Sequence, residues 1–190
     1  MDTKNIMIVG VGGQGTLLAS KLLGEVLLQQ GYDVKVSEVH GMSQRGGSVV
    51  TYVRFGDKVY SPVIDRGEAD FILSFEKLEA ARWLSYFQPG GQIITNTQEI
   101  EPMPVITGGA KYPEDLVAKL EASGAKVIAK DFLSLAEQAG SAKCVNIVLM
   151  GCLASCYPEI PEESWLKAME KVVPDKFLEL NKKAFALGKC

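Results

Sequence analysis

A glycine-rich stretch near the start of the chain is the first feature with the chemistry to bind a ligand. Gly10, Gly12 and Gly15 match the pattern G-x-G-x-x-G. Gly13 and Gln14 complete the stretch. It lies between a β-prone run and a helical pattern, where backbone N–H groups and the positive end of a helix dipole favour an anion. The same glycines also let a helix pack closely on a sheet, so a purely structural role stays open.

A second candidate is the acidic residue expected about 20 positions further on, which hydrogen-bonds the ribose of NAD in dinucleotide sites. Glu38 occupies that position. A chain of 190 residues leaves little sequence for a substrate domain, and Glu38 leads into a loop that a plain dinucleotide site does not need. A stand-alone NAD-binding Rossmann oxidoreductase and a non-enzymatic nucleotide-binding module therefore remain the alternatives to weigh.

The loop after Glu38 looks built to meet a charged group. It reads His40-Gly41-Met42-Ser43-Gln44-Arg45-Gly46-Gly47 and holds the only histidine of the chain. Its arginine can bind a carboxylate or phosphate through two parallel bonds, and its glycines allow close backbone approach. The competing interpretation pairs Arg45 with Glu38 or another carboxylate and leaves His40 solvated. The candidate near-site residues are Gln14, Glu38, His40, Gln44 and Arg45, and the candidate backbone groups are Gly10, Gly12, Gly13, Gly15, Gly46 and Gly47.

Composition excludes several classes of partner. The formal net charge is -3 and the chain has no run of lysine and arginine, so it has no electrostatic footprint for a nucleic acid or an anionic membrane. The apolar run at residues 6–9 is too short for an export signal or a membrane span. These observations predict a cytoplasmic protein.

The cysteines do not form a metal-binding pattern. Cys144, Cys152 and Cys156 are spaced to share one face of a helix. The two-residue gaps typical of zinc and iron–sulfur ligands are missing, so no metal site is predicted. We interpret the three as small buried hydrophobic residues, and Cys190 as uninformative. Asn96 and Asn146, two weaker site candidates, are interpreted as local cap or turn residues.

An α/β arrangement must position these residues. The chain opens with a β-prone run at residues 5–9, followed by the glycine turn and a helical pattern that includes Leu18 and Val26 and stops at Gly31. Residues 32–39 form a second predicted strand. The opening is therefore a βαβ unit with parallel strands and a right-handed crossover.

The rest of the chain alternates strands and helices after one interruption. Residues 48–54 and 58–60 flank a Phe-Gly-Asp turn signal and predict an inserted β-hairpin. Residues 99–110 are predicted to be irregular, with at most a short strand. Strands are predicted over 69–75, 91–95 and 126–130, and helices over 76–87, 113–124, 132–139, 144–157, 161–172 and 175–187. The predicted fold is one α/β domain, a Rossmann-like three-layer sandwich with a mostly parallel sheet, the inserted β-hairpin and a helical C-terminal third.

The two glycine motifs together resemble a known family. The stretch from Gly10 to Gly15, followed by Ser37-Glu38-Val39 and the loop to Gly47, is similar to the gamma-type domain of pyruvate and other 2-oxoacid:ferredoxin oxidoreductases. The motif His-Gly-Met-Ser-Gln-Arg-Gly-Gly resembles that of the indolepyruvate (arylpyruvate) branch. The resemblance runs from about residue 5 to the C-terminal helices, and it implies a single pyruvate/ketoisovalerate oxidoreductase gamma-type catalytic domain over residues 1–190.

The resemblance also implies a division of labour. In such enzymes thiamine diphosphate attacks the 2-oxo carbon, carbon dioxide leaves, electrons pass through iron–sulfur clusters to ferredoxin, and the acyl group leaves on coenzyme A. Thiamine diphosphate, Mg²⁺, the clusters and coenzyme A are expected through a larger partner subunit of a hetero-oligomer. This chain is expected to bind no cofactor tightly and to be inactive alone.

The chain's own part, by the same resemblance, is to shape the entry for substrate or coenzyme A. The glycine turn and the Arg45 loop are expected to face the partner, with Gln14 and Arg45 as donors to an anionic group. An obligate subunit should also carry an apolar surface patch that the partner covers.

A first test changes the loop arginine. Because Arg45 lies in a loop, Arg45→Ala is expected to leave the fold intact and to lower the activity of the assembled complex. Thermal unfolding checks the first expectation and turnover of the complex checks the second. Unchanged turnover would refute a role for Arg45 near the site.

Overall fold

The structure is a computed structural model that describes residues 2–39 and 46–190. Three of the predicted near-site residues, His40, Gln44 and Arg45, lie outside the described residues. No helix in the described ranges is long and apolar enough to cross a membrane.

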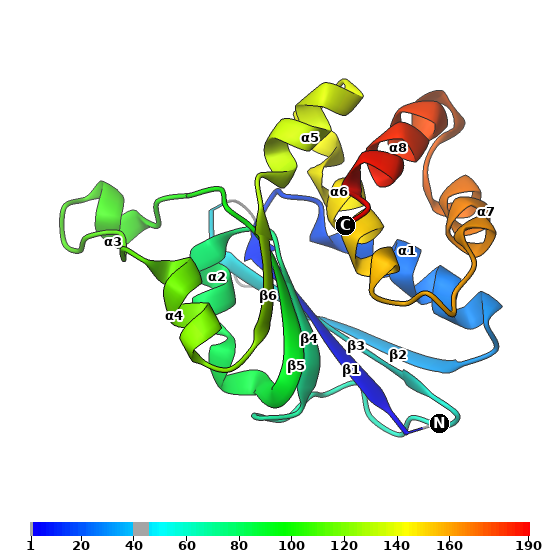
Figure 1. The fold of residues 1–190 in the computed structure, drawn as a ribbon, viewed down its shortest axis with the longest axis horizontal. Coiled ribbons are helices and arrows are strands. Elements are labelled where there is room, and N and C mark those ends of the chain that lie inside the picture. Colours follow the sequence, from blue (N-terminus) through cyan, green and yellow to red (C-terminus); the bar gives the residue numbers. More distant parts are fainter. Residues whose placement is uncertain (1, 40–45) are drawn as a thin grey trace.

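A mixed sheet with the strand order β2-β3-β1-β4-β5-β6 forms the middle of the molecule (Figure 1). The neighbours β1 and β4, β4 and β5, and β5 and β6 are parallel, whereas β3 is antiparallel to both β1 and β2. The strands are β1 (Lys4–Val11), β2 (Asp33–Val39), β3 (Ser48–Gly56), β4 (Ala69–Ser74), β5 (Phe87–Asn96) and β6 (Lys126–Lys130). β1 and β2 therefore run in the same direction, as predicted, but β3 lies between them.

The predicted hairpin of residues 48–54 with 58–60 is wrong. β3 forms its hairpin with β2 instead, from the pair Asp33↔Gly56 to the pair Val39↔Val50. β3 has nine residues and most of them are buried, so its partners are the two long strands β1 and β2 rather than a three-residue run. In the segment after β3, Val59 is buried and donates its N–H to the Asp33 carboxylate at 2.8 Å.

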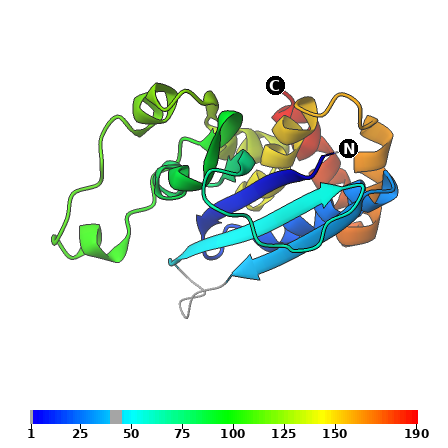
Figure 2. The ribbon, with the colours of Figure 1, turned by 90° about the horizontal axis from the view of Figure 1, so that it is seen from below.

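Helices cover both faces of the sheet, which confirms the three-layer prediction (Figures 1 and 2). One face carries α1 (Thr16–Gln29), α5 (Phe132–Ala139), α6 (Val145–Ser155), α7 (Glu162–Val172) and α8 (Asp175–Gly188), and the other carries α2 (Lys77–Arg82) and α4 (Leu116–Ala122). Short turns of helix connect them: η1 (Leu84–Tyr86), α3 (Met103–Ile106) and η2 (Ala142–Cys144). Residues 99–110 thus contain a short helix, not the short strand allowed by the sequence.

Alternation along β1 divides the core between the two layers. Ile6 and Ile8 are fully buried in the cluster under α1 and α6, whereas Met7 and Val9 are fully buried in the cluster under α2 and α4. Successive side chains of a strand point to opposite faces, so a strand buried on both sides is apolar throughout. The carboxyl end of β1, where the glycine turn begins, is therefore held from both sides.

The helical C-terminal third packs around α6, which is buried over residues 145–153. Glycines set the approach of α6 to α8, because a Cβ at Gly151 would overlap the carbonyl oxygen of Phe185 and one at Gly188 would overlap that of Val148. A disulfide joins Cys152 of α6 to Cys190, two residues past the end of α8, with the Cα atoms 5.2 Å apart.

The disulfide corrects the interpretation of the cysteines. Cys144 and Cys152 are buried as predicted, but Cys152 is bonded to Cys190, the cysteine to which the sequence assigned no role. Cys144 and Cys156 are free thiols, and Cys156 is partly exposed. The pairing was missed because the spacing of three cysteines along one helix says nothing about a fourth that arrives from another element.

Helix glycines with and without space for a side chain give a stability prediction. Gly151→Ala is expected to destabilise the protein by about 1–3 kcal/mol, because the added methyl group has no space between α6 and α8. Gly24→Ala in α1 is the matched control, since its Cβ would meet only Val36 Cγ2 at 3.8 Å. The control should be neutral or stabilising by up to about 1 kcal/mol. Urea denaturation measures both, and equal effects of the two substitutions would contradict the packing described.

Candidate functional site

The two glycine motifs meet at the carboxyl end of β1. Gly12 donates its N–H to the carbonyl of Gly47 at 2.8 Å, and Gly46 donates its N–H to the carbonyl of Gly12 at 3.4 Å. These bonds continue the β1–β3 ladder beyond its last pair, Val11↔Ser48. The predicted backbone groups of both motifs are therefore brought together, although the chain between them runs through a helix and a strand.

The glycines of the turn serve different purposes. A Cβ at Gly10 would lie 3.0 Å from Phe75 Cβ, and one at Gly15 would lie 2.8 Å from the Asn146 amide nitrogen. These two positions fit the structural interpretation of close packing. Gly13, with φ of +102° and nothing within 4 Å of its Cβ position, has no packing role and faces open space. The structural interpretation thus applies to Gly10 and Gly15, and ligand binding at Gly13 stays a prediction.

Gln14 closes the turn from inside. Its side-chain oxygen accepts the N–H of Val11 at 2.8 Å, and its side-chain nitrogen donates to the carbonyl of Phe75 at 3.1 Å and to Gln98 Oε1 at 3.5 Å. These contacts fix the amide in one orientation beside the cleft described below. Gln14 is thus part of the framework of the turn, and its role as a donor to an anionic group stays a prediction.

Two buried asparagines tie neighbouring elements to the turn. Asn96, at the end of β5, accepts the N–H of Phe132 at 3.0 Å and donates to the carbonyl of Phe75 at 3.3 Å. Asn146 accepts the N–H of the next residue, and it also donates to the carbonyl of Gly15 at 3.2 Å. From the sequence, both asparagines were interpreted as local caps or turn residues. That interpretation misses these tertiary bonds, because the partners are 36 and 131 positions away.

A cleft of about 490 Å³ opens beside the turn. α1 leaves β1 on one face of the sheet and α2 leaves β4 on the other, so the cleft lies at a topological switch point, where open α/β sheets bind ligands. Lys143 supplies the charged side chain of its wall. Its lining residues are Gly13, Gln14, Gly15, Gln98, Ile100, Leu133, Ala142, Lys143 and Val145. A wall of turn backbone, amides and one lysine suits an anionic or extended polar ligand.

Of the two predicted near-site side chains that the structure describes, Gln14 lines the cleft and Glu38 does not. Its carboxylate accepts the hydroxyl of Ser20 on α1 at 2.9 Å. Because β3 lies between β1 and β2, Glu38 is two strand spacings, about 10 Å, from the strand that leads into the glycine turn. In a dinucleotide site the acidic strand neighbours the glycine strand. This geometry argues against the NAD-dependent alternative.

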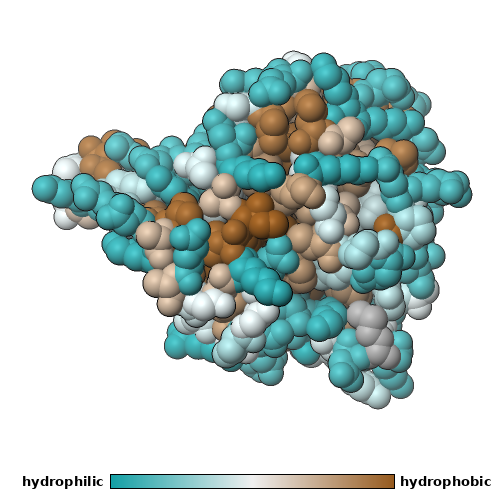
Figure 3. All heavy atoms as spheres, viewed as in Figure 1, coloured by the Kyte–Doolittle hydropathy of each residue, from teal (hydrophilic) through white to brown (hydrophobic). Residues whose placement is uncertain are grey.

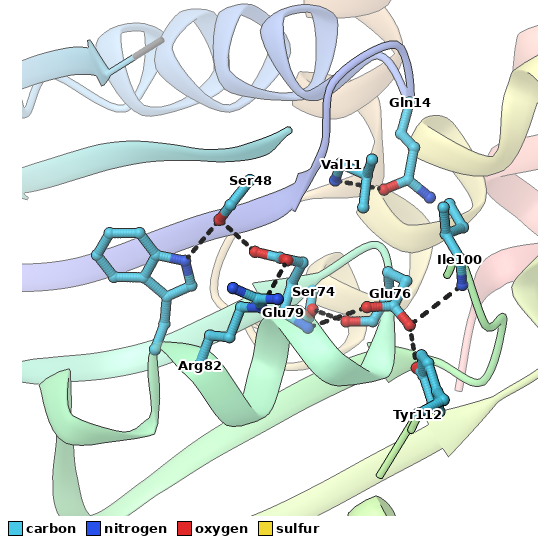
Figure 4. A network of polar contacts seen from close by, with 10 residues as sticks. Val11, Gln14, Ser48, Ser74, Glu76, Glu79, Arg82, Ile100 and Tyr112 are labelled. Carbon is cyan, nitrogen blue, oxygen red and sulfur yellow. Dashed lines mark hydrogen bonds and ion pairs between the residues drawn. The ribbon is translucent and has the colours of Figure 1, made fainter. Parts of the chain in front are cut away.

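A polar network that the sequence did not reveal holds the start of β3 (Figure 4). Ser48, the residue after Gly47, donates its hydroxyl to the buried carboxylate of Glu79 and accepts the indole N–H of Trp83 at 3.4 Å. Arg82 forms an ion pair with Glu79, with 3.2 Å between Nε and Oε1. The network therefore anchors the Gly46-Gly47 segment to α2.

A second buried carboxylate, Glu76, lies at the start of the same helix (Figure 4). It accepts the N–H of Glu79 at 3.0 Å, which caps α2, and the N–H of Ile100 at 3.4 Å. The hydroxyl of Tyr112 donates to it as well. The available sequence signal was a pair of glutamates three residues apart immediately after an apolar strand, a spacing typical of a helix start.

No group of three or more histidine, cysteine, aspartate or glutamate residues able to hold a metal ion occurs in the parts of the chain that the structure describes. What the geometry defines is a Rossmann-like α/β protein whose glycine turn lines a cleft at the switch point and is hydrogen-bonded to the Gly46-Gly47 segment.

Comparison with known proteins defines the family. The sequence profile of the pyruvate ferredoxin/flavodoxin oxidoreductase family matches residues 5–189, and the chain belongs to this family. The resemblance predicted from the glycine motifs is thus confirmed.

Curated relatives and a solved structure agree with this assignment. The indolepyruvate oxidoreductase subunit IorB of Thermococcus kodakarensis is 46% identical, with 99% of this chain and 95% of the relative covered. The subunit of the same name from Archaeoglobus fulgidus is 37% identical, with 97% and 92% covered. The gamma subunit of a keto/oxoacid ferredoxin oxidoreductase from Geobacter sulfurreducens is 25% identical and superimposes with a TM-score of 0.75, over 97% of this chain and 95% of that one.

The cysteines of this chain do not fit the iron–sulfur clusters that the family implies. A cluster of this kind is held by four ligands, usually cysteine thiolates. Cys152 and Cys190 are bonded to each other, which leaves two free thiols, Cys144 and Cys156. No step of the reaction is therefore assigned to a cluster on this chain.

The buried Glu79 gives a pH prediction. Burial raises the pKa of the Glu79 carboxyl above 4.5, and the nearby Glu76 adds to this, while Ser48 and Arg82 oppose it. The folded state therefore holds this proton more tightly than the unfolded state, and stability is lost as the pH rises from 4.5 through the raised pKa. Glu79→Gln keeps an oxygen that accepts the Ser48 hydroxyl but carries no charge. The free energy of unfolding of this variant, relative to that of the wild type, should therefore rise between about pH 4.5 and neutral pH.

Glu163→Gln is the matched control. Glu163 is exposed, and its pKa is lowered by a hydrogen bond from Lys167. Glu163→Gln should therefore not raise the free energy of unfolding at neutral pH. Denaturation curves across the pH range measure both variants. Parallel curves for Glu79→Gln and the wild type would contradict a buried charged carboxylate at this position.

Proposed function

We propose that this chain is the small, non-cofactor-carrying subunit of an indolepyruvate (arylpyruvate) ferredoxin oxidoreductase complex. The complex would decarboxylate a 2-oxoacid oxidatively to acyl-CoA and pass the electrons to ferredoxin. The observation that carries the proposal is the 46% identity to an indolepyruvate oxidoreductase subunit, which covers 99% of the chain and therefore includes both glycine motifs. The match to an oxoacid ferredoxin oxidoreductase gamma subunit supports it.

The larger partner subunit would supply the cofactors. Thiamine diphosphate with Mg²⁺ would provide the decarboxylation chemistry, and iron–sulfur clusters would carry electrons to ferredoxin. The free thiols Cys144 and Cys156 do not make a cluster site, which supports this division of labour. The same proposal places the chain in the cytoplasm as a single domain that works only in a hetero-oligomer.

The contribution of this chain would be a binding surface for an anionic group. Coenzyme A carries phosphates, and the turn at the start of α1 offers backbone N–H groups together with the positive end of a 14-residue helix. Lys143 adds a positive charge to the cleft wall. The hydrogen bonds of Gln14, Asn96 and Asn146 would keep this surface rigid. Binding would then order the ligand but would not have to order the protein.

The NAD-dependent alternative has less support. The carboxylate of Glu38 bonds Ser20 and lies two strands from the strand that leads into the glycine turn. A nucleotide-binding module without activity would show stabilisation by a nucleotide without turnover.

Reconstitution tests the proposed function. Reduction of ferredoxin or a viologen dye is measured anaerobically with indolepyruvate and coenzyme A, for this chain alone, the candidate large partner alone, and both together. Activity is expected only in the mixture, because the cofactors and the binding surface lie on different chains. Pyruvate and 2-oxoglutarate in place of indolepyruvate rank the substrates.

Two controls make the result decisive. A mixture with heat-denatured small chain should be inactive, and NAD in place of the dye should give no reduction with the small chain alone. An inactive mixture, together with NAD-linked activity of the small chain, would overturn the proposal and restore Glu38 as a ribose ligand.

A further inference from the structure

A projecting segment between β5 and α4 is unlike the rest of the surface. Residues 101–111, called the arm below, extend away from the body of the molecule in both ribbon views (Figures 1 and 2). None of residues 101–115 is buried. Loops of this kind, with ends held close together and a tip without core contacts, are frequently functional.

The base of the arm is fixed at both ends by one buried group. Ile100, just before the arm, donates its N–H to Glu76 Oε1 at 3.4 Å, and Tyr112, just after it, donates its hydroxyl to the same oxygen. Lys77 lies over the Tyr112 ring and pairs with Glu99. Burial raises the pKa of the Tyr112 hydroxyl, so it remains a donor. The arm is therefore held in place although its tip touches no core.

The tip is apolar and has nothing to cover it. Met103 is 64% exposed and Ile106 is 60% exposed, on the short helix α3. In the space-filling view, apolar atoms are visible among polar ones on this projecting end (Figure 3). A bond from the N–H of Ala110 to the carbonyl of Pro104, at 2.9 Å, closes the tip on itself. The internal bond shows that the exposed side chains belong to an organised element.

We propose that the arm is a docking element for the larger subunit, inserting Met103 and Ile106 into an apolar pocket that has a basic rim. This inference rests on the proposed function, because it assumes that the larger subunit exists. The arm would then be the apolar surface patch that the sequence predicts for an obligate subunit.

The charges around the arm indicate which charges the partner should carry. The exposed acid Glu101 precedes the tip, and the exposed acids Glu114 and Asp115 follow Tyr112 at the base, against the lysine Lys111 in the arm itself. A second copy of this chain docked by a two-fold axis through the arm would place these acids against their own counterparts. A partner with lysine or arginine around the pocket would meet opposite charges instead.

Position and size favour the same partner. Ile100 belongs to the base of the arm and also lines the cleft beside the glycine turn, so one partner can cover both. A stable interface needs about 800 Å² and 20–30 residues on each side, more than an 11-residue arm offers. The arm would therefore act as an anchor at the margin of a larger contact that includes the cleft.

Binding to the purified large subunit tests the proposal. Association is measured by biolayer interferometry under anaerobic conditions for the wild type, the double variant Met103→Asp with Ile106→Asp, and Tyr60→Asp. Tyr60 is 85% exposed and follows the end of β3 that pairs with the amino end of β1, whereas the arm follows the carboxyl end of β5. The arm variant should raise Kd at least about tenfold and the Tyr60 variant no more than about twofold.

Two further variants sharpen the test. Met103→Ala with Ile106→Ala removes the anchor without adding charge and should weaken binding in the same direction. Glu101→Lys with Glu114→Lys should weaken binding at low salt, with the difference from the wild type shrinking as salt screens the charges. Tighter binding of the lysine variant would overturn the basic rim. Melting temperatures equal to that of the wild type show that each variant is folded.

The failures of the two proposals are distinguishable. If the wild type binds the large subunit and the arm variants bind as well as Tyr60→Asp does, the docking proposal is wrong and the proposed function stands. If the wild type does not bind at all, both are wrong. If the chain alone is a dimer that the arm variants convert to a monomer, the arm binds a second copy and the proposal is overturned.

Discussion

The hydrogen bonds between Gly12 and the Gly46-Gly47 segment connect the two motifs on which the site depends. They extend the β1–β3 ladder past its last regular pair, and a ladder of this kind tolerates little displacement. The strand insertion that gives the sheet its mixed order is therefore also what brings the second motif to the first. With β2 beside β1, as in a plain dinucleotide fold, the Gly46-Gly47 segment would have no place at the glycine turn.

The remaining polar contacts hold the two joined glycine motifs in place from neighbouring helices. Glu79 and Ser48 hold the start of β3 from α2, and Asn146 holds Gly15 from α6. Burying the Glu79 carboxylate costs free energy. The hydrogen bond from Ser48 and the ion pair with Arg82 offset that cost only in part, since the pKa of Glu79 is raised. Such a cost is understandable where the geometry of a binding surface matters more than maximal stability.

How much of this was visible in the sequence depended on the range of each interaction. The boundaries of β6 and α5 matched the predictions because the signals are local: the Asp131 side chain, for example, caps α5 by accepting the N–H of Ser134 at 2.9 Å. The partner of β3 was wrongly predicted because a nearby β-prone run competed with a distant strand that buries more surface. Asn96, Asn146 and the Cys152–Cys190 disulfide depend on partners that only the fold brings near, and no local pattern indicates them. Glu38 was placed at the site by analogy with a fold in which β3 is not inserted.

Hydrogen–deuterium exchange of this chain, alone and bound to the large subunit with coenzyme A, tests most directly whether the joined glycine motifs face the partner. Peptides covering residues 10–17 and 46–49 should exchange more slowly in the complex, because ligand and partner would cover the turn and the start of β3. Unchanged exchange there, with protection confined to residues 57–68 between β3 and β4, at the other end of the strands, would contradict the assignment of this surface.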